Sequence, residues 1–119
     1  MEHIILKLLQ FQNQMKIYHF QTNLYSRHVA ADKLVENISA KLDLIAEILQ
    51  FQHPIKLKKN SVIKLQNLND EDIVEYLNGM VTWLNTKFLT KVTNKPEILT
   101  VRDELLGDVK QTLYLFNLK

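Results

Sequence analysis

Apolar residues recur along most of this chain at alternating spacings of four and three residues, the pattern of one buried face on an α-helix. The longest uninterrupted run predicts a helix over about residues 25–51, preceded by a similar one over about residues 2–21. The stripe of the longer helix consists of Leu24, His28, Ala31, Val35, Ile38, Leu42, Ile45 and Leu49. Because such stripes must be buried against other elements, the helices are expected to pack into a bundle.

Two further helices are predicted, over about residues 70–91 and 96–118. Asp70, Glu71 and Asp72 suit the positive end of the third helix, and Pro96 suits the first turn of the fourth. A short break joins the first helix to the second, and another joins the third to the fourth. A long segment, with a short helix or turn near residues 61–65, joins the second helix to the third. We therefore predict an all-α fold: a single ferritin-like four-helix domain over residues 1–119, with one long crossover between helices 2 and 3.

Composition narrows the classes of protein further. Two glycines and two prolines are too few for the tight turns of an all-β fold. The absence of cysteine excludes disulfides, thiolate zinc sites and iron–sulfur clusters. The net charge of +2 is too small to indicate nucleic acid by itself. With no signal-peptide pattern and no apolar run of the roughly 18 residues that a membrane helix needs, we expect an intracellular protein without a membrane partner.

The second helix carries metal-binding residue types beside its apolar stripe. At about 100° per residue they fall within one quadrant of the helix. They are His28, Asp32, Glu36, Asp43 and Glu47. Imidazole and carboxylate ligands without sulfur suit Fe²⁺, Mn²⁺ or Zn²⁺. No glutamate lies three residues before a histidine, so a Glu-x-x-His di-iron site within one bundle is not predicted.

These ligands form two pairs, and one chain cannot bring the pairs together. His28 and Asp32 lie one turn apart, as do Asp43 and Glu47, but the pairs are separated by roughly 16 Å along the helix axis. Metal–ligand bonds are only about 2.0–2.2 Å long. A second copy whose helix packs antiparallel across a twofold axis would close the gap twice per dimer. The spacing therefore predicts a metal site between two subunits.

The residues of this site resemble the ferroxidase signature of the Dps family, mini-ferritins that bind and oxidise iron and in many members protect DNA. The family pattern is a histidine followed by an aromatic residue, a second histidine with aspartate one turn later, and then Asp-x-x-Ala-Glu. The matching residues are His19-Phe20, His28, Asp32 and Asp43-Leu44-Ile45-Ala46-Glu47. Phe20 stands where most members have tryptophan, and the Gly-Pro turn between the histidines is absent. The chain is also similar to small uncharacterised proteins of large DNA viruses.

The resemblance implies an iron-binding ferroxidase that acts in iron detoxification or DNA protection. His19 and His28 would bind the iron or lie beside it, and Asp32 would bind it directly or through water. Asp43 and Glu47 would come from the partner subunit, with Glu47 as the strongest ligand. Iron is favoured by the resemblance alone, with zinc or manganese as alternatives. The implied partner is the chain itself, as a homodimer through the second helix or as a dodecamer, in the cytoplasm or in a virion.

A function of another class stays open. The chain could be a non-catalytic helical dimer, or a structural or virion-associated assembly protein that retains a ferritin-like fold. The histidines and carboxylates would then form a polar seam between subunits. Within one chain, His28 could simply be a buried histidine that hydrogen-bonds to Asp32.

The crossover is basic, with Lys56, Lys58, Lys59 and Lys64 close together. A solvated loop is the default interpretation of such a run, and a contact with phosphate or DNA through Lys56, Lys58 and Lys59 is the sharper one. The large aromatic residues of the last two helices are expected in the core. They are Tyr76, Trp83, Phe88, Tyr114 and Phe116.

Overall fold

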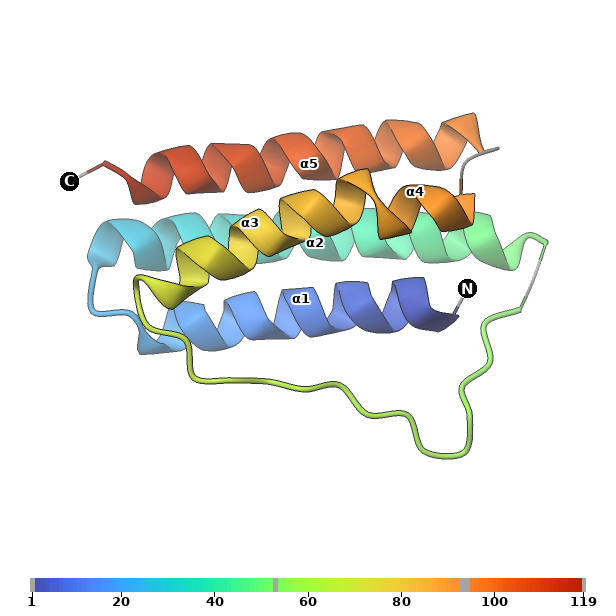
Figure 1. The fold of residues 1–119 in the computed structure, drawn as a ribbon, viewed down its shortest axis with the longest axis horizontal. Helices are drawn as coiled ribbons and strands as arrows, with labels where there is room; N and C mark the ends of the chain where they lie inside the picture. The colour runs from blue at the N-terminus through green and yellow to red at the C-terminus, as the bar shows by residue number, and fades with distance from the viewer. Residues whose placement is uncertain (1, 53, 93–94, 119) are drawn as a thin grey trace.

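Long helices lie side by side along the whole length of the molecule (Figure 1). The computed structural model describes residues 2–52, 54–92 and 95–118. The helices are α1 (Glu2–Gln21), α2 (Tyr25–Gln50), α3 (Asp72–Asn85), α4 (Lys87–Val92) and α5 (Pro96–Phe116). The short helix α4 continues the line of α3, so the pair fills one position of a four-helix bundle. No strand occurs in the described ranges, and the predicted all-α fold is confirmed.

The connections follow the predicted order. Residues 22–24 join α1 to an antiparallel α2, and the long crossover over residues 51–71 returns the chain to the other end of the bundle (Figure 1). As a result α3 runs parallel to α2, and α5 runs antiparallel to both. Helix α2 packs against α1 on one flank and α5 on the other. One long crossover between the second and third positions is the connectivity of ferritin-like bundles.

The core is built from the apolar stripes. Burying a large apolar side chain fully is worth about 1.5–3 kcal/mol, so these stripes supply the main stabilisation of the bundle. The α1 residues at the same alternating spacing are buried, and five of the eight residues of the α2 stripe are buried as well: Ala31, Ile38, Leu42, Ile45 and Leu49. The buried α1 and α2 residues include Ile4, Leu8, Phe11, Met15, Tyr18, Ala31, Leu34, Ile38, Ile45 and Leu49. Three members of the predicted α2 stripe are not buried: Leu24 is exposed in the junction before α2, and His28 and Val35 are half-buried.

The third predicted helix is divided, which corrects the single helix expected over residues 70–91. The helix breaks at Thr86, whose φ of −126° and ψ of −84° are not helical. Its hydroxyl donates to the carbonyl oxygen of Thr82 at 2.7 Å. One turn precedes α3, where Asn69 Oδ1 accepts from the backbone N–H groups of Glu71 and Asp72. The short break predicted before Pro96 includes residues 93 and 94, which lie outside the described residues.

The crossover has no helix among its described residues, so the helix or turn expected near residues 61–65 is replaced by extended chain. Its position is set by Gln14 of α1, which is only 1% exposed. The Gln14 side-chain amide donates to the carbonyl oxygen of Gln66 and accepts from its backbone N–H, both at 2.8 Å. A buried amide needs such partners, so Gln14 fixes the crossover at Gln66, and the side chains of Ile55 and Leu68 pack it against the core.

Most of the aromatic residues lie where they were expected. Phe88 and Phe116 are buried, and Tyr76 and Trp83 are partly buried against the core. Burial raises the pKa of Tyr76 to about 12. The prediction for Tyr114 was wrong, because its side chain is 63% exposed. At about 100° per residue, Tyr114 falls nearly opposite the buried stripe of α5.

None of the described helices is both long and apolar enough to span a membrane.

Candidate functional site

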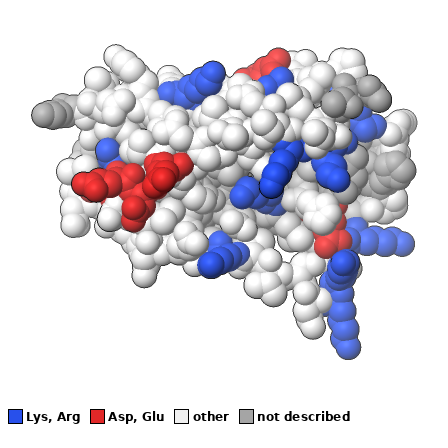
Figure 2. Space-filling model, viewed as in Figure 1, with Lys and Arg blue, Asp and Glu red and all other residues white. Residues whose placement is uncertain are grey.

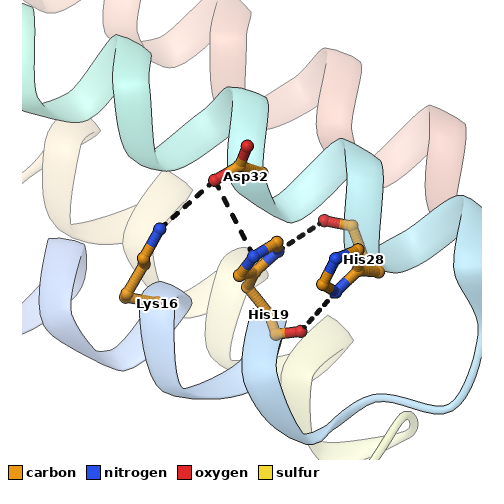
Figure 3. A network of polar contacts seen from close by, with 4 residues as sticks. All are labelled: Lys16, His19, His28 and Asp32. Atoms are coloured by element: carbon orange, nitrogen blue, oxygen red, sulfur yellow. Dashed lines mark hydrogen bonds and ion pairs between the residues drawn. The ribbon is translucent and has the colours of Figure 1, made fainter.

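Two histidines meet where α1 ends and α2 begins. His19 lies in the last turn of α1 and His28 in the first turn of α2, on either side of the short junction (Figure 3). Their rings stack with centroids 3.8 Å apart and an interplanar angle of 19°. The Nδ1 atom of His19 lies 2.7 Å from the carbonyl oxygen of His28, and the Nδ1 atom of His28 lies 2.7 Å from that of His19. The pair therefore closes the corner between the two helices through reciprocal hydrogen bonds.

These hydrogen bonds determine which ring nitrogens can do chemistry. A carbonyl oxygen can only accept, so each Nδ1 carries a proton and donates it. In the neutral imidazole the lone pair is then on Nε2, in both rings. Histidines that bind metals usually donate their other N–H to a carbonyl or carboxylate, because that bond fixes the ring and its tautomer. In both rings Nε2 is therefore the nitrogen that the hydrogen bonds to the carbonyl oxygens leave unused.

Asp32 stands one turn after His28 and faces α1 (Figure 3). Its Oδ1 atom lies 3.8 Å from Nε2 of His19 and 3.3 Å from Nζ of Lys16. Sequence reasoning missed Lys16, although it lies one turn before His19 and so on the same side of α1. The Lys16–Asp32 pair is more than two-fifths exposed, and such pairs contribute little to stability, about 0–1 kcal/mol. A cation that bound Asp32 would therefore displace Lys16 at small cost.

The structure does not bring the other predicted ligands to this corner. Glu36, Asp43 and Glu47 are exposed on α2, and the last two lie roughly three turns or more beyond Asp32. Within the described part of the chain, no three histidine or acidic side chains converge well enough to hold a metal ion. The interpretation of His28 as hydrogen-bonded to Asp32 was wrong, because His28 Nδ1 uses the carbonyl oxygen of His19. One chain thus brings His19 beside His28 and Asp32 and does not bring Glu36, Asp43 or Glu47 to them.

A second polar network lies at the same end of the bundle, and sequence reasoning did not find it. Arg27 Nη1 donates to the Tyr18 hydroxyl and to the carbonyl oxygen of Asp70, and Nη2 donates to the carbonyl oxygen of Phe116. The Tyr18 hydroxyl donates to Asp70 Oδ1 at 2.6 Å, and the Thr22 hydroxyl donates to the same oxygen at 3.0 Å. Burial, followed by the hydrogen bond to Asp70, raises the pKa of Tyr18. This network joins α1, α2, α5 and the end of the crossover, so it supports the corner that holds the histidines.

The lysines of the crossover are all exposed, namely Lys56, Lys58, Lys59 and Lys64. Figure 2 shows basic side chains projecting from this part of the molecule, while acidic ones gather over the start of α3. No acidic residue occurs between residues 51 and 69. Since the whole chain has a net charge of +2, the rest of it without these four lysines has a charge of −2. The positive charge of the protein is thus concentrated on the crossover.

The fold defines an all-α, four-helix protein, in which two histidines and an aspartate lie together between the first two helices. The chain belongs to the family of unknown function DUF5856, whose model matches residues 19–116. No curated protein and no solved structure matches the chain. No Dps or ferritin-like relative is identified, so the likeness to Dps rests on the residues of the site alone.

Proposed function

We propose that this protein is a Dps-like ferroxidase, which binds iron at a site shared by two copies of the chain and serves in iron detoxification or DNA protection. The observation that carries the proposal is the pair of reciprocal Nδ1–carbonyl hydrogen bonds between His19 and His28. They leave Nε2 as the ligand atom of each ring, and Nε2 of His19 already lies beside Asp32. A set of imidazoles and carboxylates without sulfur suits Fe²⁺.

In this proposal the partner's Asp43 and the partner's Glu47 complete the ligand set. Two ferrous ions each give one electron to hydrogen peroxide, which takes up two protons, breaks its O–O bond and leaves as two water molecules. The side chains would hold the ions, and the carboxylates would stabilise the higher charge of the oxidised iron, because they bind Fe³⁺ more strongly than Fe²⁺. Lys16 would leave Asp32 when iron binds.

Glu47→Gln tests the site with minimal change of shape, because the amide removes only the charge. We expect the variant to bind Fe²⁺ at least about tenfold more weakly in an anaerobic titration. Mutation of residues that only support the ligands of a metal site already lowers metal affinity by about 10–100-fold. Peroxide oxidation, followed by the ultraviolet absorbance of ferric iron, should fall in parallel. Glu75→Gln is the matched control, an exposed carboxylate on α3. Equal affinity in the two variants, or oxidation no faster than in buffer, would reject the proposal.

A non-catalytic assembly protein is the second candidate, and one observation favours it. Both histidines are satisfied by backbone carbonyls and Asp32 is paired with Lys16, so the corner is complete without a metal. The cluster would then act as a clasp between α1 and α2. Under this alternative, elemental analysis of the purified protein finds no bound metal, and Glu47→Gln leaves every metal measurement unchanged.

We also propose that the crossover contacts phosphate groups of DNA. Each lysine that neutralises a phosphate steepens the salt dependence of binding to duplex DNA by about 0.9 units of log K per unit of log salt. Replacing Lys56, Lys58 and Lys59 with glutamine should therefore reduce the slope by about 2–3 units, measured by fluorescence anisotropy. The control replaces three exposed lysines elsewhere, Lys87, Lys91 and Lys110. An equal loss in both variants would show that binding follows net charge and not the crossover.

A further inference from the structure

The outward side of α2 carries a second regular row of residues, opposite the stripe that faces the core. Neighbouring members lie three or four positions apart, so the row runs straight along the helix. We call it the outer row of α2, and it consists of Tyr25, Val29, Lys33, Glu36, Ala40, Asp43, Glu47 and Phe51, all exposed. Helices α1 and α5 flank α2, and α3 lies across the bundle from it (Figure 1). No described part of the chain covers the outer row.

Large apolar side chains are exposed along this side of the molecule. Phe51 is 89% exposed and Tyr25 is 79% exposed, one at each end of α2. Val29 belongs to the same row and Leu44 lies beside it, and both are about half exposed. Tyr25 and Val29 lie one turn apart at the start of α2, and Leu44 and Phe51 lie about two turns apart at its end, so this side has an apolar segment at each end and charged residues between them.

We propose that a second copy of this chain covers the outer row, with the two α2 helices antiparallel and Tyr25 against the partner's Phe51. In this register every residue of the row meets another member of it. Tyr25 meets Phe51, Val29 meets Glu47, Lys33 meets Asp43, and Glu36 meets Ala40, each pair occurring twice across the twofold axis. Two kinds of pair match in chemistry: aromatic contacts form at both ends, and Lys33 meets Asp43 of opposite charge on each side of the axis. Near the centre Glu36 meets the small Ala40.

Registers shifted by one helical turn match less well. A shift in one direction places Glu36 on the axis against the partner's Glu36, which brings like charges together. A shift in the other direction places Ala40 on the axis, but Tyr25 and Asp43 then have no partner in the row. The register with Tyr25 against Phe51 is therefore the one in which every residue of the row has a partner in it and no directly opposed pair carries like charges.

The same register brings the partner's Asp43 and the partner's Glu47 alongside Asp32 and His28. Asp43 and Glu47 belong both to the outer row and to the predicted ligand set, so one register satisfies the charge pairing and the ligand spacing together. This part of the inference rests on the proposed function, whereas the contact between the helices needs no metal. In this proposal the second copy thus buries the outer row and also contributes the partner's Asp43 and the partner's Glu47 to the metal site.

Exchanging the charges of Lys33 and Asp43 tests both the dimer and its register. The native mass is measured in the presence of a chelator, where we expect a dimer. Lys33→Asp alone places two aspartates together on each side of the axis and should weaken the dimer by about tenfold or more. Lys33→Asp/Asp43→Lys restores opposite charges and should restore the dimer. Lys110→Asp, at an exposed position on α5, is the control that should leave the mass unchanged.

The outcomes separate this inference from the proposed function. A dimer in chelator that shows no iron oxidation supports the contact and rejects the ferroxidase. A monomer in chelator overturns the contact, whatever the metal measurements show. Rescue of Lys33→Asp by Glu47→Lys instead of Asp43→Lys overturns the register, because Lys33 faces Glu47 only in the shifted arrangement.

Crosslinking gives a direct readout, because the chain has no cysteine of its own. Tyr25→Cys and Phe51→Cys are made as separate proteins and oxidised gently, alone and mixed. A disulfide needs Cα atoms about 4.4–6.8 Å apart, so it reports close approach. We expect a crosslinked dimer in the mixture and little in either protein alone. Crosslinking of Tyr25→Cys with itself would mean parallel helices and would overturn the inference.

Discussion

Lys41→Met is expected to lower the free energy of unfolding by about 2–4 kcal/mol, near the range for breaking a buried ion pair. Lys41 of α2 and Asp108 of α5 approach to 2.9 Å, and each side chain is only 18% exposed. Asp108 Oδ2 has no aligned hydrogen-bond donor in the described residues, so the nearby ammonium group is its main compensation. Methionine keeps the apolar stem of lysine but leaves the carboxylate uncompensated beside the core. Equilibrium unfolding in urea, followed by circular dichroism, measures the loss.

Two further variants identify the cause of this effect. Lys110→Met removes an exposed lysine from α5 and should change stability by less than about 0.5 kcal/mol. Lys41→Met/Asp108→Leu removes both charges and should recover most of the stability, because a buried pair replaced by apolar residues is often neutral. If Lys41→Met costs no more than Lys110→Met, the ion pair does not stabilise the contact between α2 and α5.

The helices could be predicted from the sequence because each buried stripe is a local pattern. The stripes of α1 and α2 alternate between three and four residues, and this spacing alone determines both the element and its buried face. The break at Thr86 could not be found in this way, since the apolar spacing continues through it from Leu84 to Phe88. The break is a change of backbone conformation at Thr86, which leaves no trace in the apolar pattern.

The candidate site could be predicted only in part, for a related reason. The ligand types and their spacing along α2 are visible in the sequence, and the structure does bring His19, His28 and Asp32 together. The carbonyl partners of the histidines were not predictable, because every residue has a carbonyl and the helix angle decides which one is reached. Lys16 was missed because it belongs to another helix and pairs across the junction.

Long-range polar contacts were the hardest features to predict. The hydrogen bonds of Gln14 reach 52 positions along the chain, and one bond of Arg27 reaches 89. Neither residue type is unusual at the surface of a helix, so nothing in the sequence marks these two as structural. Such residues become recognisable only when the topology places their partners beside them.

Arg27→Met tests the residue on which the histidine corner depends, and we expect it to cost about 2–4 kcal/mol of unfolding free energy. Arg27 donates to Tyr18 of α1, to Asp70 at the end of the crossover and to Phe116 at the end of α5. Its guanidinium group also lies 4.8 Å from the ring centroid of Phe116, within the range of a cation–π contact. Methionine retains the stem and loses all of these contacts. The carbonyl of Phe116 is at a helix C-terminus, where it has no partner within the helix and attracts a positive charge.

Arg27→Lys distinguishes the positive charge from the geometry of the guanidinium group. Lysine keeps the charge, but its ammonium group cannot reach acceptors on three elements at once, as the planar guanidinium does. We therefore expect Arg27→Lys to recover less than half of the loss in urea unfolding. Full recovery would mean that charge alone matters, and an Arg27→Met protein as stable as the parent would mean that the network adds nothing. The network also supports the end of α1 and the start of α2, so loss of Arg27 should loosen the stacked histidines. Hydrogen exchange measures this effect, because the backbone amides of the junction should then exchange faster.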